Sequence, residues 1–367
     1  MRKHRPAPLL VVAAAMILLL AACGGSPTSP GGDQGKGAAA SAAYTELEKL
    51  SADELVKRAE GEGQLDLYTS MTADVADEVT GAFEDEYDIT VNLYRASSET
   101  VLQRILQEQQ ANFRGNDLVE TNATEMFALE KEGRLAPYTG APRNTVAKAG
   151  IFPSWTATRF NIFSPSWNTK LVKRGAEPKS WEELADPKWK GKISMEIGDY
   201  DWFLTLHGYW VKQGKSAQEA EQLFRGMARN AKIVKGHTVQ GELLSAGQFA
   251  VAVSNYTYLT QRLVDKGAPI AYKPLVQPVI ARPNGVGLMK TAKHPAAALL
   301  FTNWILTKGQ DVLIDAGITP SVQGRETALQ GVQVIPVDVK TLTEENKKWS
   351  DLYEQIISEG EKVPERG

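Results

Sequence analysis

The chain has 367 residues, is 43% hydrophobic and 23% charged, and carries a formal net charge of −3 at neutral pH. A chain of this length can bury two cores, and its mildly acidic balance argues against nucleic acid as a partner, because phosphate binding requires a basic face. Its one cysteine excludes a disulfide framework.

The first 22 residues have the plan of a secretory signal peptide. Basic residues near the start precede an apolar run, Leu9 to Ala22, which is shorter than the roughly 20 residues of a membrane-spanning helix. The run ends in Leu-Ala-Ala-Cys, which resembles the lipobox of bacterial lipoproteins. That resemblance implies that Cys23 becomes lipid-modified and begins the mature protein on the extracytoplasmic face of the cell membrane. The alternative is a plain signal peptide that happens to contain a cysteine.

Residues 23–45 are rich in glycine, serine, alanine and proline and show no apolar period. Such a composition builds no core, and we expect a flexible tether that holds a folded body away from the membrane. No later stretch approaches 18 consecutive apolar residues, so the expected membrane attachment is the lipid anchor.

After the tether, strands and helices alternate, which indicates crossover units and a parallel sheet. The first strand ends in small hydroxyl residues, the second helix has Ser97 or Ser98 as its cap, and Gly133 ends the third helix. The predicted strands are 64–70, 89–97 and 116–123, and the helices that follow them are 72–87, 98–111 and 124–132.

A second alternating set begins near Pro153. It contains strand material at 158–172, a short helix, a loop and a strand within 180–197, and two helices at 199–214 and 216–230. Strand, helix, strand and helix follow within 231–267, and the pattern closes within 285–317. Two alternating groups predict a two-lobed α/β protein with a cleft between the lobes.

The order of several local phrases resembles the extracellular solute-binding proteins of ABC importers, and nearest to them the iron(III)-binding branch of the type II periplasmic-binding fold. The phrases are "LYTS", "YRASSETVLQRI", "WNTKLV", "SWEELADPKWKGKI", "GELLSAGQFAVAVSNY" and "HPAAALLFTNWILTKGQ". They extend over most of the chain after the tether.

The resemblance implies two lobes, each a mostly parallel sheet flanked by helices, joined by two crossing strands and closing on a small ligand. We expect lobe 1 to comprise residues 46–140 and 282–320, and lobe 2 residues 141–281 and 321–367. The implied partners are a membrane permease and its ATPase. We expect a monomer.

Candidate ligand-binding residues follow the strands, because the carboxyl ends of parallel strands meet at one edge of a sheet. From the first half they are Thr69, Ser70, Arg95, Ser97, Ser98 and Asn122, with Thr124 nearby. A guanidinium beside a helix N-terminus suits an oxyanion. The alternative is that the serines only cap their helix and that Arg95 forms a surface or interlobe ion pair.

Candidates from the second half are Trp155, Asp199, Tyr200, Trp202, His237, Asn255 and Tyr256. Six of the eight tryptophans lie between residues 155 and 210, and most of them are expected to pack in the core. Trp155 and Trp202 are the two assigned to the cleft. The alternative for His237 is a structural role.

Two tyrosines, Tyr256 and Tyr258, follow the alternating strand "QFAVAV". We expect a helix from Tyr256 to Lys266 with Asn255 as its N-cap. Because each helical residue is rotated by about 100° from the one before, Tyr256 and Tyr258 would then point in nearly opposite directions. We therefore expect Tyr256 to reach the cleft, Tyr258 to lie on a lobe surface, and the two not to act as a pair.

Ferric-binding relatives, by the resemblance, use two adjacent tyrosines at this strand-to-helix join. Here the second place is Thr257, so the match carries over only to Tyr256 as a metal ligand. An organic anion such as a carboxylate or phosphonate fits Arg95 and the helix N-termini better, and a metal chelate would also satisfy them. No cofactor is expected; iron(III) would be cargo.

Two other classes remain open. An enzyme would use the same cleft, with Asp199 and Asp201 as an acid pair, but the chain lacks the common nucleophile, metal and phosphate motifs. A structural cell-surface lipoprotein is the other alternative, but a purely structural role does not explain why the chain would form two lobes.

Overall fold

The structure is a computed structural model that describes residues 42–325 and 329–362. The predicted signal peptide, the lipidation site Cys23 and most of the predicted tether lie outside these residues. The end of the predicted tether differs from expectation, because residues 42–47 are helical. Tyr44 in this segment is 1% exposed, and its hydroxyl donates to Met289 O at 3.2 Å. A buried ring ties the segment to the folded body.

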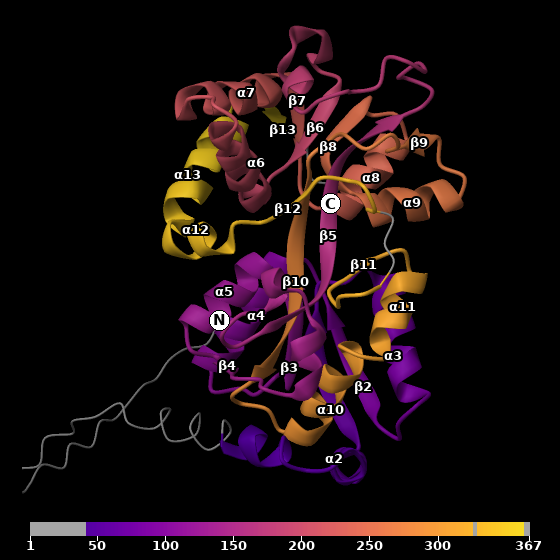
Figure 1. Cartoon of the computed structure of the whole chain (residues 1–367), viewed down its shortest axis with the longest axis vertical. Helices are drawn as coiled ribbons and strands as arrows, with labels where there is room; N and C mark the ends of the chain where they lie inside the picture. Colours follow the sequence, from indigo (N-terminus) through magenta and orange to yellow (C-terminus); the bar gives the residue numbers. More distant parts are fainter. Residues whose placement is uncertain (1–41, 326–328, 363–367) are drawn as a thin grey trace, which may run out of the picture.

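Two lobes lie one above the other along the long axis (Figure 1). The lower lobe in this view begins with three strand-helix units. Its elements in chain order are α2 (Ala52–Glu62), β1 (Gln64–Thr69), α3 (Ala73–Glu84), β2 (Thr90–Arg95), α4 (Ser98–Gln110), β3 (Leu118–Asn122), α5 (Ala123–Lys131), β4 (Leu135–Ala136) and the short 3-10 turns η1 (Ala141–Thr145) and η2 (Lys148–Gly150).

The chain then passes to the upper lobe along β5 (Thr156–Asn168). In the upper lobe α6 and α7 lie on one flank of the strands, and α8 and α9 lie on the other. Its elements are η3 (Glu182–Ala185), η4 (Pro187–Trp189), β6 (Ile193–Glu196), α6 (Tyr200–Lys212), α7 (Ala217–Asn230), β7 (Ala231–Val234), α8 (His237–Ser245), β8 (Val251–Tyr256), α9 (Thr257–Asp265) and β9 (Ile270–Ala271).

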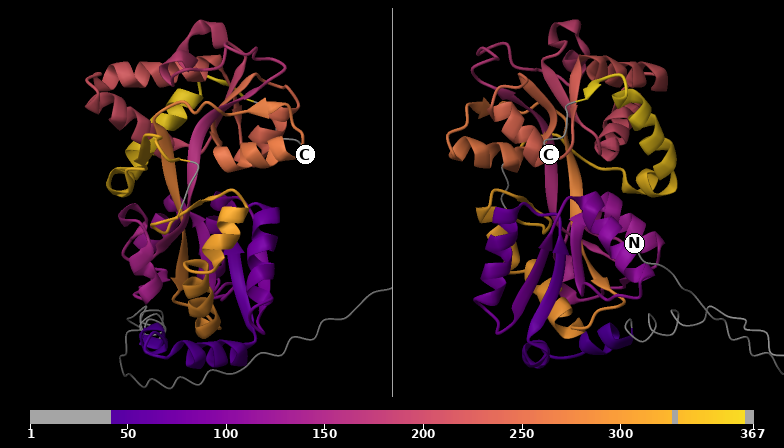
Figure 2. Two further views of the ribbon diagram at one scale, coloured as in Figure 1. Left: turned by 45° about the vertical axis from the view of Figure 1, so that its right-hand side comes forward. Right: turned by 180° about the vertical axis from the view of Figure 1, so that it is seen from behind.

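The chain returns downward along β10 (Val279–Met289), and its last helices return to the upper lobe beside α6 and α7 (Figures 1 and 2). The remaining elements are α10 (Pro295–Ile305), α11 (Gly309–Asp315), β11 (Thr319–Pro320), β12 (Val334–Pro336), α12 (Val339–Glu344), α13 (Asn346–Ile357) and β13 (Glu361–Lys362).

One continuous sheet path runs through both lobes in the order β13-β7-β6-β8-β5-β10-β3-β1-β2. Within the lower lobe β1 pairs in parallel with β2 and β3, and within the upper lobe β6 pairs in parallel with β7 and β8. The long strands β5 and β10 pair antiparallel with each other and join the two parallel sets. The predicted two-lobed α/β architecture is confirmed.

The two long strands are buried along their whole length on both faces and include buried polar residues such as Arg159 and Arg282, so their sequences do not alternate between apolar and polar. For this reason the sequence pattern showed only the end of β10, near residues 285–291, and missed the stretch from Val279. The first six predicted elements are present with bounds that differ by at most three residues. The residue boundaries of the lobes stay a prediction.

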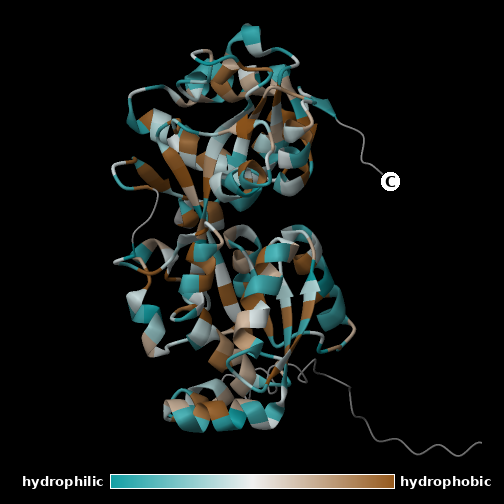
Figure 3. Cartoon of the chain, turned by 90° about the vertical axis from the view of Figure 1, so that its right-hand side faces the viewer, coloured by the Kyte–Doolittle hydropathy of each residue, from teal (hydrophilic) through white to brown (hydrophobic). Residues whose placement is uncertain are grey.

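Each lobe has an aromatic core. Trp181, Trp202 and Phe224 pack in the upper lobe, and Phe83 and Phe301 pack in the lower one. Hydrophobic residues concentrate on the central strands and hydrophilic residues on the outer helices (Figure 3). Among the described residues, the structure contains no helix with the length and apolar character of a membrane span.

The carboxyl ends of β1, β2 and β3 lead directly into α3, α4 and α5, at the side of the lower lobe that faces the upper lobe. Ser97 has extended backbone angles and accepts a hydrogen bond from Thr100 N at 3.4 Å, so it caps α4 as expected. The fold thus places three helix N-termini beside the space between the lobes.

Gly285 lies where β5 and β10 cross, next to a shift in their register. A Cβ there would lie 2.2 Å from Trp155 Cε3 and 2.8 Å from the backbone oxygen of Thr156. We expect Gly285→Ala to lower the free energy of unfolding by about 1–3 kcal/mol in denaturant titrations. Gly208→Ala is the matched control, because nothing lies within 4 Å of its Cβ position in α6. Gly208→Ala is expected to raise the free energy of unfolding by about 0.5–1 kcal/mol. Equal effects of the two changes would contradict this account.

Candidate functional site

A cleft of about 320 Å³ lies between the lobes and is lined from both of them. Its lower wall consists of residues that follow β1, β2 and β3, and its upper wall of residues that follow β6, β7 and β8, with the crossing strands behind. The polar and charged lining residues are Ser70, Thr72, Arg95, Ser97, Ser98, Glu99, Asn122, Thr124, Glu125, Asn161, Glu196, Lys235, His237, Thr238, Tyr256, Tyr258 and Arg282.

Helix N-termini from both lobes meet at this cleft. Besides α4, the helices α3, α5, α8 and α9 begin at its wall, with Thr72, Asn122, Gly236 and Tyr256 as their N-cap residues. Among the described residues, none of these four N-caps forms a side-chain capping bond. The positive ends of several helix dipoles therefore face the same space, which favours an anion.

Arg95 stands at the end of β2 beside these amides. Its Nε donates to Met71 O at 2.7 Å, which fixes the guanidinium in place. Ser70 follows β1, and its hydroxyl lies 3.1 Å from that of Thr121. The lower wall thus offers a positive charge and hydroxyl groups.

Arg282, in the crossing strand β10, is the central cation of the upper wall. It is 3% exposed, and its Nε donates to Asp201 Oδ2 at 2.6 Å while Nη2 donates to Asp199 Oδ1 at 3.0 Å. Its Nη1 donates to the hydroxyl of Tyr256. Burial would lower the pKa of Arg282, but the charges of both aspartates raise it well above its usual value.

His237 lies on the same cluster. Its ring stacks on Tyr256 at 4.0 Å between centroids, and Nε2 lies 3.2 Å from Asp199 Oδ2. Burial would lower the pKa of His237, but the charge of Asp199 outweighs burial and the pKa is raised. Burial likewise raises the pKa of the buried Tyr256 hydroxyl well above 10, so this phenol holds its proton.

Two glutamates on the cleft wall have raised pKa values. Glu196 accepts hydrogen bonds from Gly236 N at 2.8 Å and Gly198 N at 2.5 Å, and burial together with Asp199 raises its pKa to about 7. Glu125 is 6% exposed, and burial together with the charge of Glu99 raises its pKa to about 8.

Seven of the predicted ligand-binding residues line the cleft, and six do not. Those that line it are Ser70, Arg95, Ser97, Ser98, Asn122, His237 and Tyr256. Those that do not are Thr69, Trp155, Asp199, Tyr200, Trp202 and Asn255, and among these Asp199 lies directly behind His237 and Arg282.

The placement of Trp155 and Trp202 at the cleft is wrong. Trp155 is 1% exposed and stacks on Phe152 at 3.8 Å, and Trp202 is fully buried against Trp181 and Phe224. Both rings bury large apolar areas, which outweighs any gain from lining a polar cleft.

Thr69, Asn255 and Tyr200 also point elsewhere. Thr69 is fully buried and donates to Glu120 Oε2 at 2.9 Å. Asn255 belongs to β8 and is not the cap of α9, because its Oδ1 accepts from Tyr256 N at 2.8 Å. The hydroxyl of Tyr200 accepts from Asn346 at 3.1 Å.

The predicted separation of the two tyrosines is wrong. Tyr256 is the last residue of β8, and the helix begins one residue later, so helical geometry does not relate the two rings. Tyr258 is 6% exposed, and the ring planes differ by 13° with centroids 5.9 Å apart. Both tyrosines line the cleft.

Several lining residues were missed from the sequence, above all Arg282, Glu125 and Asn161. Arg282 interrupts the apolar run "VIARPNGVGLM", and a charge within a buried strand was a usable signal. Asn161 and Glu125 carry no such local sign, because only the crossing of the strands and the start of α5 bring them to the cleft.

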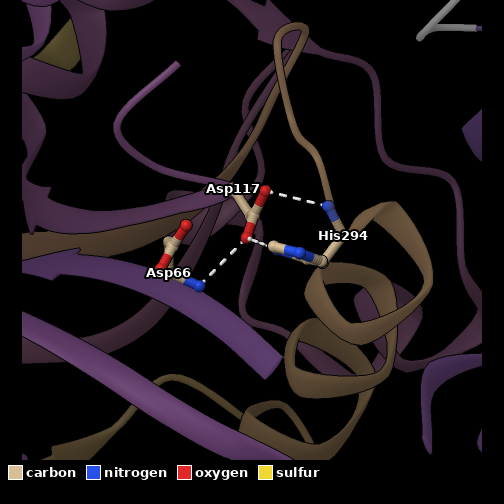
Figure 4. A group of neighbouring side chains, drawn as sticks. All are labelled: Asp66, Asp117 and His294. Carbon is tan, nitrogen blue, oxygen red and sulfur yellow. Dashed lines mark hydrogen bonds and ion pairs between the residues drawn. The ribbon is translucent and has the colours of Figure 1, made fainter. Parts of the chain in front are cut away.

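A second polar cluster, Asp66, Asp117 and His294, lies at the opposite end of the lower sheet (Figure 4). Asp117 accepts from the backbone nitrogens of Lys293 at 2.6 Å and Asp66 at 2.9 Å, and from His294 Nδ1 at 2.7 Å. Because its oxygens are already bonded, this cluster joins β1, β3 and the start of α10 and is not a ligand site.

A hinged pair of lobes with a polar cleft at the strand ends defines a binding protein for a small solute. Residues 63–312 match the family described as bacterial extracellular solute-binding protein, and the chain belongs to it. It is the solute-binding component of an ABC importer, and this component acts outside the cytoplasm. Members of this family bind solutes and deliver them to a permease.

The relatives include iron uptake protein A1 of Synechocystis sp., which is 27% identical over 266 residues, or 67% of this chain and 71% of that protein. Iron-bound HitA from Pseudomonas aeruginosa has a TM-score of 0.67 at 18% identity, over 80% of this chain and 99% of HitA. AfuA from Actinobacillus pleuropneumoniae, with fructose-6-phosphate bound, has a TM-score of 0.70 at 21% identity, over 81% of this chain and 99% of AfuA.

The raised pKa of Glu125 predicts a pH-dependent stability. An unfolded Glu releases its proton near pH 4.3, whereas folded Glu125 keeps it to about pH 8, so this group destabilises the fold increasingly as pH rises between these values. We expect Glu125→Gln to raise the free energy of unfolding at pH 8 by on the order of 3 kcal/mol and much less at pH 5. Thermal unfolding at both pH values measures this. Glu60→Gln, at an exposed site, is the control, and an equal gain at both pH values would contradict the assignment.

Proposed function

We propose that this protein captures a small organic anion, such as a carboxylate or phosphonate, in the interlobe cleft and delivers it to its permease. The observation that carries the proposal is the meeting of four helix N-termini without side-chain caps, among the described residues, with Arg95 at one cleft. We assign the ligand contacts to Ser70, Arg95, Ser97, Ser98, Asn122, His237 and Tyr256.

The ion pairs in the upper wall favour a ligand with a small negative charge. Arg282 and His237 are balanced by Asp199 and Asp201, so the upper wall contributes donors without a large net charge. Arg95 and the amides then supply the positive field that attracts the ligand.

We further propose that a lipid at Cys23 anchors the protein to the membrane, that it acts as a monomer, and that it catalyses no reaction. The lipobox-like sequence and the glycine-rich segment after it support the anchor. Metabolic labelling with a fatty acid, compared between the natural chain and Cys23→Ala, tests it.

Iron(III) is a second candidate. Tyr256 and Tyr258 lie side by side, and Glu196, Asp199 and His237 offer ligand atoms within 4.8 Å of one another. The names of iron-binding relatives add support. Iron is the second choice because Tyr256 is held by Arg282 and burial raises its pKa, so that a phenolate is costly to form.

Arg95→Ala tests the anion proposal. Loss of one charged hydrogen bond costs about 2 kcal/mol, so we expect the dissociation constant of the best anion from a thermal-shift screen to rise roughly 30-fold. Isothermal calorimetry measures the change. Arg174→Ala is the control, because Arg174 is exposed and does not line the cleft. An unchanged affinity in Arg95→Ala would remove Arg95 from the site.

Absorption spectroscopy with ferric citrate separates the two candidates. A ferric phenolate absorbs visible light, and an anion site without iron ligation produces no such band. We expect no band from the natural chain. If a band appears that is lost in Tyr256→Phe and kept in the control Tyr209→Phe, iron is the cargo and the organic-anion proposal is wrong.

A further inference from the structure

Three glutamates from three different elements meet on the wall of the cleft. Glu99 opens α4, Glu125 lies in the first turn of α5, and Glu196 ends β6. The first two belong to the lower lobe and the third to the upper lobe. Carboxyl groups are the opposite of what an anion site alone requires.

These carboxyl groups are close together. The position that a Cβ of Gly198 would occupy lies 3.2 Å from Glu196 Oε2 and 3.3 Å from Glu99 Oε1, so acids of both lobes approach one point. Glu99 also lies near enough to Glu125 for its charge to act on that carboxyl. Glu99 and Glu196 therefore meet at one point of the cleft wall, and Glu125 lines the same cleft; we call these three residues the acidic end.

Two of the cations that line the cleft, Arg282 and His237, are already paired with aspartates. Arg282 and His237 are bonded to Asp199 and Asp201. Over residues 42–325 and 329–362, Oε2 of Glu125 is buried without a hydrogen-bond donor, whereas Glu99 is exposed to solvent. Glu196 accepts hydrogen bonds from the backbone amides of Gly236 and Gly198.

An independent observation points to a ligand at the same place. Asn161, in the crossing strand β5, is 2% exposed and lines the cleft, yet its Oδ1 has no donor in the described part of the chain. Its register partner on β10 is Arg282, whose charge also reaches Glu125. A buried acceptor without a donor costs about 1–3 kcal/mol, which a bound donor group would recover.

We propose that the acidic end of the cleft, Glu99, Glu125 and Glu196 with Asn161, binds an ammonium group, so that the ligand is a small zwitterion. Its anionic group would lie at Arg95 and the helix N-termini, and in this the inference rests on the proposed function. An ammonium carries three N–H donors and no acceptor, which matches a set of carboxyl and amide oxygens. An anion without such a group would leave the buried Asn161 Oδ1 and Glu125 Oε2 without a donor.

The division of the acids between the lobes adds a consequence. Because Glu196 belongs to one lobe and Glu99 and Glu125 to the other, an ammonium bound among them is held from both sides. Such a group stabilises the closed arrangement as well as selecting the ligand, since it contacts all three carboxyl groups only when the lobes are together.

Matched ligand pairs test this inference. Isothermal calorimetry of the natural chain compares phosphoethanolamine with ethyl phosphate, and β-alanine with propionate; each pair shares the anionic group and differs by the amine. We expect the amine to lower the dissociation constant at least 10-fold in the pair that fits. Glu99→Gln should bring this ratio close to one, and Glu125→Gln should do so above pH 8, where Glu125 is ionised, whereas Glu60→Gln, at an exposed site on α2, should leave the ratio unchanged.

The outcomes separate this inference from the proposed function. If ethyl phosphate or propionate binds as tightly as its amine, the ammonium site is wrong and the anion proposal stands. A preference for the amine that survives both glutamine substitutions would also overturn the site, because the amine would then be bound elsewhere. If neither member of either pair binds, the result counts against both proposals. Glu125→Gln is expected to fold at least as stably as the natural chain, so misfolding does not explain a lost preference.

Discussion

The buried guanidinium of Arg282 is the interaction on which the cleft depends. A cation that is 3% exposed is tolerable only with anions and hydrogen-bond acceptors around it, and Asp199, Asp201 and Tyr256 supply them. These partners come from the loop after β6, the start of α6 and the end of β8, while Arg282 itself lies in the crossing strand. One charge thus connects the upper lobe to the segment on which both lobes meet.

The same pairing determines what the upper wall can do. Asp199 and Asp201 neutralise Arg282, and the charge of Asp199 also raises the pKa of His237. The cations of this wall therefore act as positioned donors, and the attraction for an anion comes mainly from the lower wall and the helix N-termini. Iron-bound HitA shares the fold, but a fold likeness at 18% identity says nothing of the groups that line the cleft.

The cleft combines opposite chemistries at short range. Uncapped helix N-termini and Arg95 lie at one part, and three glutamates at another. Burial raises the pKa values of Glu125 and Glu196, with a further contribution from Glu99 at Glu125 and from Asp199 at Glu196. Such burial destabilises the free protein, and proteins retain destabilised groups at sites where a ligand later satisfies them. The fold is held elsewhere, by the aromatic cores of the two lobes and by the long pairing of β5 with β10.

Local sequence patterns determined much of this protein. Strand and helix periods, the cap at Ser97 and the order of family phrases predicted the two-lobed α/β fold, and strand-end residues such as Ser70, Arg95 and His237 reached the cleft as expected, because parallel strands bring their carboxyl ends to one edge. Tertiary structure alone decided the rest. Trp155 and Trp202 entered the cores, since burial of large rings depends on neighbours distant in sequence. Tyr258 turned toward Tyr256 because α9 begins one residue later than its pattern indicates. Arg282, Asn161 and Glu125 met at the cleft only through the crossing of β5 and β10 and the packing of α5, which are long-range contacts that no local period encodes.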